Sequence, residues 1–278
     1  MMDNYQHILF PYAYNILGSA EDAKDTIQDV MTKYLSRVSP EVENEKAYLV
    51  RGVINQSINV KKRKSKEVSS QVWLPEPIAT EHADTPIERK DVLTYSMLVL
   101  LEKLKPRERA VFILREAFDY SHKEIAEAFD CSTDNARSIL SRAKKKLSRH
   151  QERKTLTQDS TDAQSFLNRY IEVIQKGDTK ALEQLMADDI CIKADGGEKV
   201  NVVREITIGK SDAIELMLFV YKSFQSSQAI KISSLNHQPA LLFYYGNRLK
   251  SCQVFELSNN KIAQIYSVID PEKLRISF

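Results

Sequence analysis

The sequence predicts a multidomain chain in which two all-α domains are followed by an α+β domain. Apolar residues recur at helical spacing through roughly the first 150 positions, with a proline-bearing break inside them. After residue 163, two helical segments lead into short segments that alternate apolar and polar residues, as strands do. A chain of 278 residues is long enough for two or three domains that each bury a core.

The composition is that of a folded protein, with 42% hydrophobic and 28% charged residues. The apolar run at 95–101 is much shorter than the roughly 20 residues that cross a bilayer. The start, MMDNYQHILF, lacks the pattern of a secretory signal. Three widely spaced cysteines predict reduced thiols, and therefore a cytoplasmic protein. No cysteine or histidine spacing indicates a metal site, and we expect no cofactor and no catalytic residue.

The net charge of +2 hides an uneven distribution. Residues 1–35 carry five acids and two bases, whereas the run KKRKSKE at 61–67 carries five bases and one acid. Residues 133–154 carry eight bases and two acids. Because phosphate binding needs local cations rather than a high total charge, this distribution permits nucleic-acid binding, although such runs are also common on solvated helix faces.

The first helical region contains a second helix, EDAKDTIQDVMTKYLSR, with one polar stripe. Gly18 is a C-cap of the preceding helix, and the spacing of Ser19 and Asp22 is that of a capping box. A third helix, roughly residues 45–64, ends in the basic run KKRK. Positions i, i+3, i+4 and i+7 of the second helix form the polar stripe Asp25, Gln28, Asp29 and Thr32.

The break at residues 67–90 predicts a linker. Pro75, Pro77 and Pro86 cannot continue a helix. The single tryptophan, Trp73, also lies here, and because an exposed tryptophan is costly we expect it to dock on the protein.

Residues 119–147 predict a helix-turn-helix. Ser121 and Glu124 form a capping box, Asp130 and Cys131 make the turn, and Ser132 caps the next helix. In this motif, residues near the start of the second helix contact base edges and its basic end contacts phosphate. The pattern alone also fits an ordinary helical hairpin.

The last region begins after a charged break at 151–162. Helices are expected at 163–176 and 177–186, and a strand that turns tightly at Asp195, Gly196 and Gly197. A helix at 211–224 precedes four more strand-like segments, the last two joined by Asn259 and Asn260. We expect a curled antiparallel sheet.

Two of these motifs resemble a known family. AYNILGSAEDAKDTIQDVMTKYL, at 13–35, is similar to the polymerase-binding part of region two of extracytoplasmic-function sigma factors, and residues 119–147 resemble their region four. The resemblance implies region two at 1–66, a linker at 67–90 and region four at 91–150. WLPEP, ADGGEK and DPEKL further resemble the sigma-J-like subgroup, which carries a C-terminal SnoaL-like domain, here 163–278. Glu198, Asp270 and Glu272 depart from that subgroup's usual motifs.

The resemblance implies core RNA polymerase and promoter DNA as partners. The stripe of Asp25, Gln28, Asp29 and Thr32 would bind core polymerase. The minus-ten element would be contacted by the loop near 39–44 and by Asn55, Asn59, Lys61, Lys62 and Arg63. The minus-thirty-five element would be contacted by Thr133, Asp134, Asn135, Arg137, Ser138, Arg142 and Lys144, with Lys145 and Lys146 also near phosphates.

The subgroup also implies that the SnoaL-like domain regulates activity in cis. We expect a protein that is monomeric when free, with no membrane partner and with room for an unidentified small ligand in this domain. The residues expected at the regulatory contacts are Trp73, Leu74, Pro75, Asp195, Gly196, Gly197, Lys199, Asp270, Pro271, Lys273 and Leu274.

Two other classes of protein remain open at this stage. A free-standing helix-turn-helix regulator would use the same stretch at 119–147. A ligand-sensing or enzymatic SnoaL-like domain fused to a DNA-binding module would need convergent polar groups in its pocket. Asp195 lies in an expected turn and His237 follows an expected strand, so neither indicates catalysis.

Overall fold

The computed structural model describes residues 2–36, 44–64, 72–80, 91–148 and 160–275. The chain forms two compact units. Unit 1 comprises Met1–Ser69 and His82–Glu152, and unit 2 comprises Ser70–Glu81 and Arg153–Phe278. The segment between the two helical regions therefore belongs to the C-terminal unit. Among the described residues, no helix is both long and apolar enough to span a membrane.

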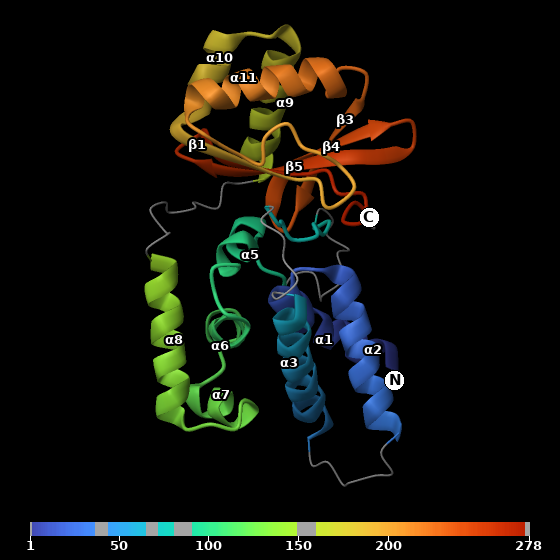
Figure 1. Cartoon of the computed structure of the whole chain (residues 1–278), viewed down its shortest axis with the longest axis vertical. Coiled ribbons are helices and arrows are strands. Elements are labelled where there is room, and N and C mark those ends of the chain that lie inside the picture. The colour runs from blue at the N-terminus through green and yellow to red at the C-terminus, as the bar shows by residue number, and fades with distance from the viewer. Residues whose placement is uncertain (1, 37–43, 65–71, 81–90, 149–159, 276–278) are drawn as a thin grey trace. The chain divides into compact units, whose positions relative to one another are not determined.

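The first half of unit 1 is a bundle of α1 (Met2–Leu17), α2 (Ala20–Ser36) and α3 (Glu45–Lys64) (Figure 1). Leu9, Ile27 and Val53 are buried between these helices. The expected cap of α2 is present, because the Asp22 amide donates to Ser19 Oγ at 3.2 Å. The helical prediction for this region is confirmed.

The second half of unit 1 contains α5 (Tyr95–Leu101), α6 (Pro106–Glu116), α7 (His122–Ala128) and α8 (Thr133–Ser148) (Figure 1). The capping box before α7 is complete, with Glu124 N–H to Ser121 Oγ at 3.2 Å and Ser121 N–H to Glu124 Oε2 at 2.7 Å. Asp130 makes the turn with φ of 49°, a conformation that aspartate tolerates better than most residues. The helix-turn-helix prediction is confirmed as a fold.

Unit 2 places helices on one face of a six-stranded sheet (Figure 1). The sheet order is β2-β1-β6-β5-β4-β3. Its strands are β1 (Met186–Asp195), β2 (Ile206–Ile208), β3 (Ala229–Leu235), β4 (Gln238–Tyr245), β5 (Arg248–Ser258) and β6 (Lys261–Val268). The helices are α9 (Ser160–Lys176), α10 (Thr179–Leu185), α11 (Lys210–Val220) and the π-helical turn η1 (Tyr221–Gln225).

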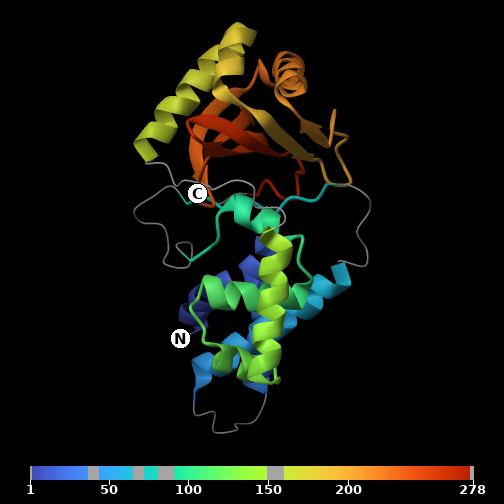
Figure 2. The ribbon, with the colours of Figure 1, turned by 90° about the vertical axis from the view of Figure 1, so that its left-hand side faces the viewer.

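The core of unit 2 lies between these helices and the curled sheet (Figure 2). Tyr170 of α9 is buried edge-on against Phe255 of β5, with ring centroids 5.3 Å apart. Leu182 of α10 and Met217 of α11 join the same cluster. The helices are amphipathic and the strands are largely apolar, so both contribute side chains to this core.

Two sequence expectations for unit 2 were wrong in detail. The sheet is not wholly antiparallel, because β1 pairs in parallel with β6. The stretch Asp195-Gly196-Gly197 is not a tight hairpin turn either. β1 does pair antiparallel with β2, but residues 196–205 lie between them. Asn259 and Asn260 do make the expected tight turn, with φ of 52° and 56°.

Candidate nucleic-acid interface

The helix α8 separates an apolar face from a polar one. Ala136, Ile139, Leu140 and Ala143 are buried. The predicted contact residues lie on the other face: Asp134, Asn135, Arg137, Ser138, Arg142 and Lys144 are exposed, and Thr133 is half-buried. The structure therefore brings the predicted minus-thirty-five residues onto one surface of one helix.

Several of these side chains already have partners on the surface. Arg137 Nη1 lies 2.9 Å from Asp134 Oδ1, and Arg142 Nη1 donates to Ser138 Oγ at 2.9 Å. Exposed pairs of this kind are weak, so they can be exchanged for contacts to DNA. Lys146 differs, because it bonds the largely buried Glu108 at 2.6 Å and stabilises the packing of α8 on α6.

The end of α3 presents most of the predicted minus-ten residues. Asn55, Asn59, Lys62 and Arg63 are exposed. The loop expected near 39–44 lies outside the described residues except for Asn44, which caps α3 through a 3.0 Å bond from the Ala47 amide.

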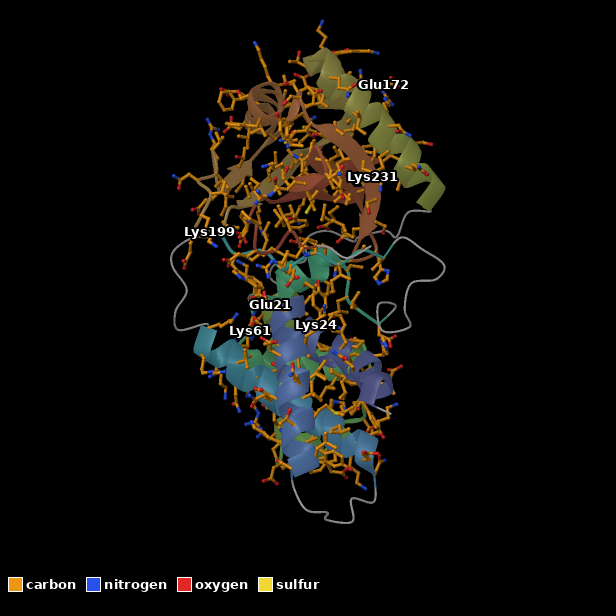
Figure 3. The ribbon with its side chains drawn as sticks, turned by 90° about the vertical axis from the view of Figure 1, so that its right-hand side faces the viewer. Glu21, Lys24, Lys61, Glu172, Lys199 and Lys231 are labelled. Atoms are coloured by element: carbon orange, nitrogen blue, oxygen red, sulfur yellow. The ribbon has the colours of Figure 1, made fainter. Side chains whose placement is uncertain are left out.

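Lys61 is not on that surface, contrary to its expected place among the exposed contacts. Its Nζ donates to the Leu17 carbonyl at 3.0 Å and to Glu102 Oε1 at 2.9 Å, and its side chain is 13% exposed (Figure 3). Burial lowers the pKa of Lys61 to about 8, and repulsion from Arg109 adds to the lowering. In this conformation Lys61 joins α3 to the second half of unit 1.

Arg109 is the centre of this buried network. It is fully buried, forms an ion pair with Glu102, and donates Nε–H to the Asn15 carbonyl at 2.9 Å. Burial by itself would raise the pKa of Glu102, but attraction to Arg109 and Lys61 outweighs it, so the pKa lies below its usual value. The Asn15 side chain bonds the backbone of Asp91 and Leu93 at 3.0 and 2.9 Å.

We did not anticipate this network from the sequence. The sequence did contain one indication of the network, namely polar residues at helix positions that are otherwise apolar. These are Asn15 in α1 and Arg109 in α6. Such residues are buried only when their polar atoms are satisfied, so each indicated a partner without identifying it.

The predicted polymerase-binding stripe is fully presented on α2. Asp25, Gln28, Asp29 and Thr32 are all exposed, whereas Ala23, Ile27 and Val30 are buried on the opposite face. Near the C-terminal end of α2, Leu35 adds an apolar side chain that is 55% exposed. Figure 3 shows the side of α2 that carries Glu21 and Lys24.

Several of the predicted regulatory residues meet within unit 2, where residues 72–80 are bound to the C-terminal domain. Leu74 is fully buried, and its amide donates to Asp195 Oδ2 at 2.7 Å. Lys273 Nζ lies 2.6 Å from the same oxygen, 2.9 Å from the Leu74 carbonyl and 4.6 Å from the centre of the Trp73 ring. We call Trp73, Leu74, Asp195 and Lys273 the linker brace.

The loop around the brace is tightly packed. Gly197 has φ of 61°, and a Cβ there would lie 2.5 Å from the Asp270 carboxylate. The Gly197 amide donates to Asp195 Oδ1 at 2.8 Å, and Lys199 pairs with Glu272 at 2.6 Å. Both oxygens of the Asp195 carboxylate therefore accept hydrogen bonds, from two backbone amides and from the Lys273 ammonium.

A second anchor for the linker was not anticipated. The Ile78 amide donates to Asn236 Oδ1 at 2.9 Å, and the Asn236 amide returns a bond to the Ile78 carbonyl at 2.8 Å. The Thr80 amide donates to the Ser234 carbonyl at 2.9 Å, and the His237 amide to Thr80 Oγ1 at 2.8 Å. The sequence indicated only a turn at Asn236 and His237. It did not indicate that these residues hydrogen-bond the linker segment.

Comparison with known proteins assigns the class of protein. Residues 1–67 match the family model of sigma-70 region 2, and residues 95–147 match that of sigma-70, region 4. The chain therefore contains both sigma-70 domains, region 2 and region 4, and is similar to extracytoplasmic-function sigma factors. An α+β domain follows the two all-α domains.

Its relatives include proteins of Mycobacterium tuberculosis. The chain is 21% identical over 277 residues to "Probable ECF RNA polymerase sigma factor SigI", covering 96% of this chain and 91% of that protein. It is 24% identical over 221 residues to "ECF RNA polymerase sigma factor SigJ", covering 77% and 69%. The crystal structure of SigJ shares the fold with a TM-score of 0.77 at 20% identity, over 98% of this chain and 96% of that one.

Proposed function

We propose that this protein directs promoter-specific initiation of transcription in the cytoplasm, as a transcription factor and not as an enzyme. In the proposal, α2 binds core RNA polymerase, α3 binds the minus-ten element and α8 binds the minus-thirty-five element. The observation that carries it is the presence of both sigma domains in one chain, each exposing a polar helix face.

Base reading by α8 would depend on Arg137. Its guanidinium fork matches the two acceptors of guanine in the major groove, and Asp134 holds it at the start of the helix. Arg142 and Lys144 would contact phosphates, which fix the position of the helix without reading sequence. Asn55 and Asn59 would read an unstacked minus-ten base, while Lys62 and Arg63 hold its backbone.

DNA binding would require unit 1 to open. A compact unit of about 140 residues has a radius of gyration of about 14 Å. Promoter elements about 25 base pairs apart are separated by about 85 Å of B-form DNA. The two sigma domains would therefore separate on the promoter, which would break the network of Lys61, Glu102 and Arg109 and release Lys61 to the minus-ten surface.

The C-terminal domain would regulate this opening through the linker. α3 ends at Lys64 and the bound segment begins at Val72, eight residues later, so the connection reaches at most about 28 Å. As long as the brace and the second anchor hold residues 72–80, this short connection keeps the end of α3 tethered to unit 2. The Asp195 carboxylate already accepts bonds from Leu74, Gly197 and Lys273, which supports a regulatory role for this loop and not a catalytic one.

Run-off transcription with purified core RNA polymerase tests the proposal, on templates taken upstream of the gene. Asp29→Arg reverses the charge of an exposed stripe residue and should reduce the specific transcript strongly. Glu172→Arg makes the same change on exposed α9 of unit 2 and should leave the transcript unchanged. Specific initiation that is insensitive to both variants would contradict the assigned polymerase surface.

The regulatory part has its own test. Trp73→Ala removes the ring that Lys273 contacts, and should change the transcript level while both units remain folded by circular dichroism. Unchanged transcription would count against control through the linker. DNase footprinting without polymerase distinguishes the alternative of a free-standing regulator, which would protect a site by itself.

A further inference from the structure

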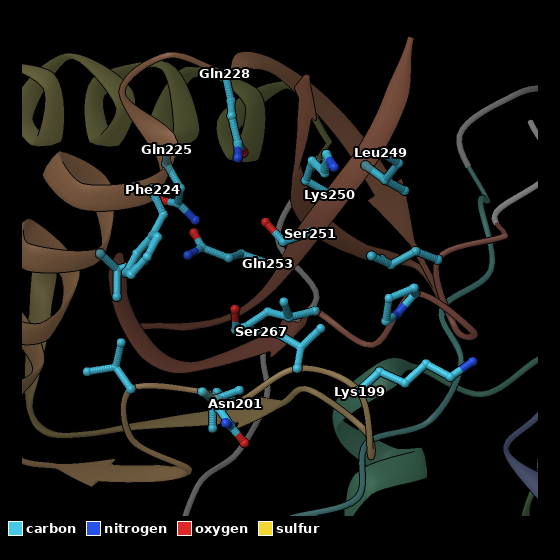
Figure 4. Close-up of a pocket in the computed structure, with 18 of the residues that line it drawn as sticks. Lys199, Asn201, Phe224, Gln225, Gln228, Leu249, Lys250, Ser251, Gln253 and Ser267 are labelled. Atoms are coloured by element: carbon cyan, nitrogen blue, oxygen red, sulfur yellow. The ribbon is translucent and has the colours of Figure 1, made fainter. Parts of the chain in front are cut away.

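Unit 2 contains a cavity of about 990 Å³ that the proposed transcription function does not use. Its walls come from β1, the segment 199–204, the end of α11 with η1, and strands β5 and β6 (Figure 4). This volume is at the upper end of cavities that hold small molecules.

Three glutamine side chains converge on the interior. Gln225 and Gln253 are 5% and 2% exposed, and Gln228 is half-buried; Figure 4 shows all three directed toward the same space. Within the described part of the chain, the amide oxygens of Gln228 and Gln253 have no hydrogen-bond partner. Buried amides without partners are costly, so a pocket that retains two of them is suited to a ligand that supplies the missing bonds.

The rest of the interior is apolar or hydroxylic. Ile192, Leu216 and Met217 are buried, and they provide surface for a hydrophobic ring. Ser251 and Ser267 add hydroxyl groups beside Gln253 (Figure 4). The charged lining residues are all exposed, so the deep part of the pocket is neutral.

The exposed charges are predominantly positive. Arg204, Arg248, Lys250, Lys199 and Arg275 line the pocket, against the single acid Glu272. Lys199 is paired with Glu272, and Arg204, Arg248 and Lys250 remain as cationic groups that can face an anion. Clefts lined by one sign of charge concentrate ligands of the opposite sign.

We propose that this pocket binds a hydroxylated, ring-containing carboxylate. The ring occupies the apolar interior, and its hydroxyl bonds the glutamine amides, because a hydroxyl both donates and accepts. The carboxylate faces the arginines and lysines at the exposed side. Binding requires neither polymerase nor DNA, so it can be tested independently of the proposed function.

Calorimetric titration of the full chain with hydroxynaphthoate tests the inference. We expect saturable binding that weakens about tenfold for naphthoate, which lacks one hydrogen bond, and similarly for the uncharged methyl ester of hydroxynaphthoate. Binding should also weaken as salt rises, because the carboxylate faces exposed cations. The absence of binding at millimolar ligand, or equal affinity for the three compounds, would overturn the proposal.

Variants locate the site. Gln253→Leu and Gln228→Leu should each weaken hydroxynaphthoate binding about tenfold, and Arg248→Ala should reduce the preference for the carboxylate over the ester. Gln175→Leu and Arg169→Ala make the same changes on the exposed surface of α9 and should bind as the wild type does. Melting curves without ligand establish folding; if Gln253→Leu fails to fold, the half-buried Gln228 gives the same test. Wild-type affinity in a folded glutamine variant would place the binding elsewhere.

Discussion

In the described part of the chain, each unit contains a largely buried ion-pair network, and the networks around Asp195 and Glu102 are built differently. In unit 2, Asp195 accepts bonds from Lys273 and from the backbone amides of Leu74 and Gly197, so two of these three partners are backbone groups. In unit 1, the partners of the Glu102 carboxylate among the described residues are two long side chains, Lys61 and Arg109, that come from different helices.

The difference lies in what each network leaves unsatisfied. The Nη2 of Arg109 is buried without a hydrogen-bond partner within the described residues, and the pKa of Lys61 is lowered to about 8 by burial. Buried ion pairs offset their desolvation cost only when the geometry satisfies them fully. The linker brace therefore has the properties of a permanent structural joint, whereas the network of unit 1 has those of a contact that opens at modest cost.

The largest expected effect comes from breaking the brace. Asp195→Ala removes three hydrogen bonds and leaves the largely buried Lys273 without its ion pair, so the free energy of unfolding of unit 2 should fall by about 3–5 kcal/mol. Urea denaturation measures this change, and hydrogen exchange should show loss of protection at 72–80. Asp188→Ala removes an exposed carboxylate that pairs with the half-buried Lys210; it is the matched control and should have little effect.

Breaking the other network should cost less. Arg109→Ala leaves Glu102 with Lys61 as its remaining partner, and should lower the free energy of unfolding of unit 1 by about 3 kcal/mol. The same variant should increase hydrogen exchange where α3 meets α6. If Arg109→Ala instead proved as stable as wild type, the network would make no net contribution to the closed form.

Two glycines with positive φ, Gly197 and Gly177, separate the effect of close packing in the brace loop from that of backbone strain. Gly197→Ala should destabilise unit 2 by about 2 kcal/mol or more, because the residue has a positive φ and its Cβ would meet Asp270. Gly177→Ala is the control for backbone strain alone, since Gly177 has φ of 67° and nothing within 4 Å of a Cβ. Equal losses in thermal denaturation would show that the close approach of Asp270 is unimportant.

The smallest expected effect is a pH dependence in unit 1. Because the folded-state pKa of Glu102 lies below the usual 4.5, its stabilising contribution is complete above pH 4.5 and is lost as pH falls through the folded pKa. Glu102→Gln should therefore be less stable than wild type by about 1–2 kcal/mol at neutral pH. This difference should shrink on acidification; a difference that stays constant with pH would exclude ionised Glu102 as the stabilising group.

The sequence was sufficient for elements that depend on local rules. The capping residues Ser19, Ser121 and Ser132, and the Asn259-Asn260 turn, form the expected local structures because each depends on neighbours within a few positions. The exposed faces of α2 and α8 follow from helical periodicity in the same way.

The remaining features depend on contacts between residues distant in the chain. Lys61 follows the buried Ile58, Ser57 and Ile54 by three, four and seven positions, so helical periodicity places it on the inner face of α3. Its partner Glu102 lies 41 residues further along the chain, and no local pattern identifies it. WLPEP was expected at a contact, but its partners Asp195 and Lys273 could be identified only once the loop after β1 and the tail were placed. The parallel pairing of β1 with β6 is likewise a property of topology that no local pattern specifies.

The most direct test of the account is the distance between the two sigma domains before and after assembly. Donor and acceptor dyes can be placed at Arg63 and Lys145, both exposed, after their replacement by cysteine in a chain whose partly exposed Cys131 and Cys191 are changed to serine. We predict high energy transfer in the free protein and a large decrease when core RNA polymerase and promoter DNA are added. Unchanged transfer in a complex that still initiates transcription would contradict the opening of unit 1.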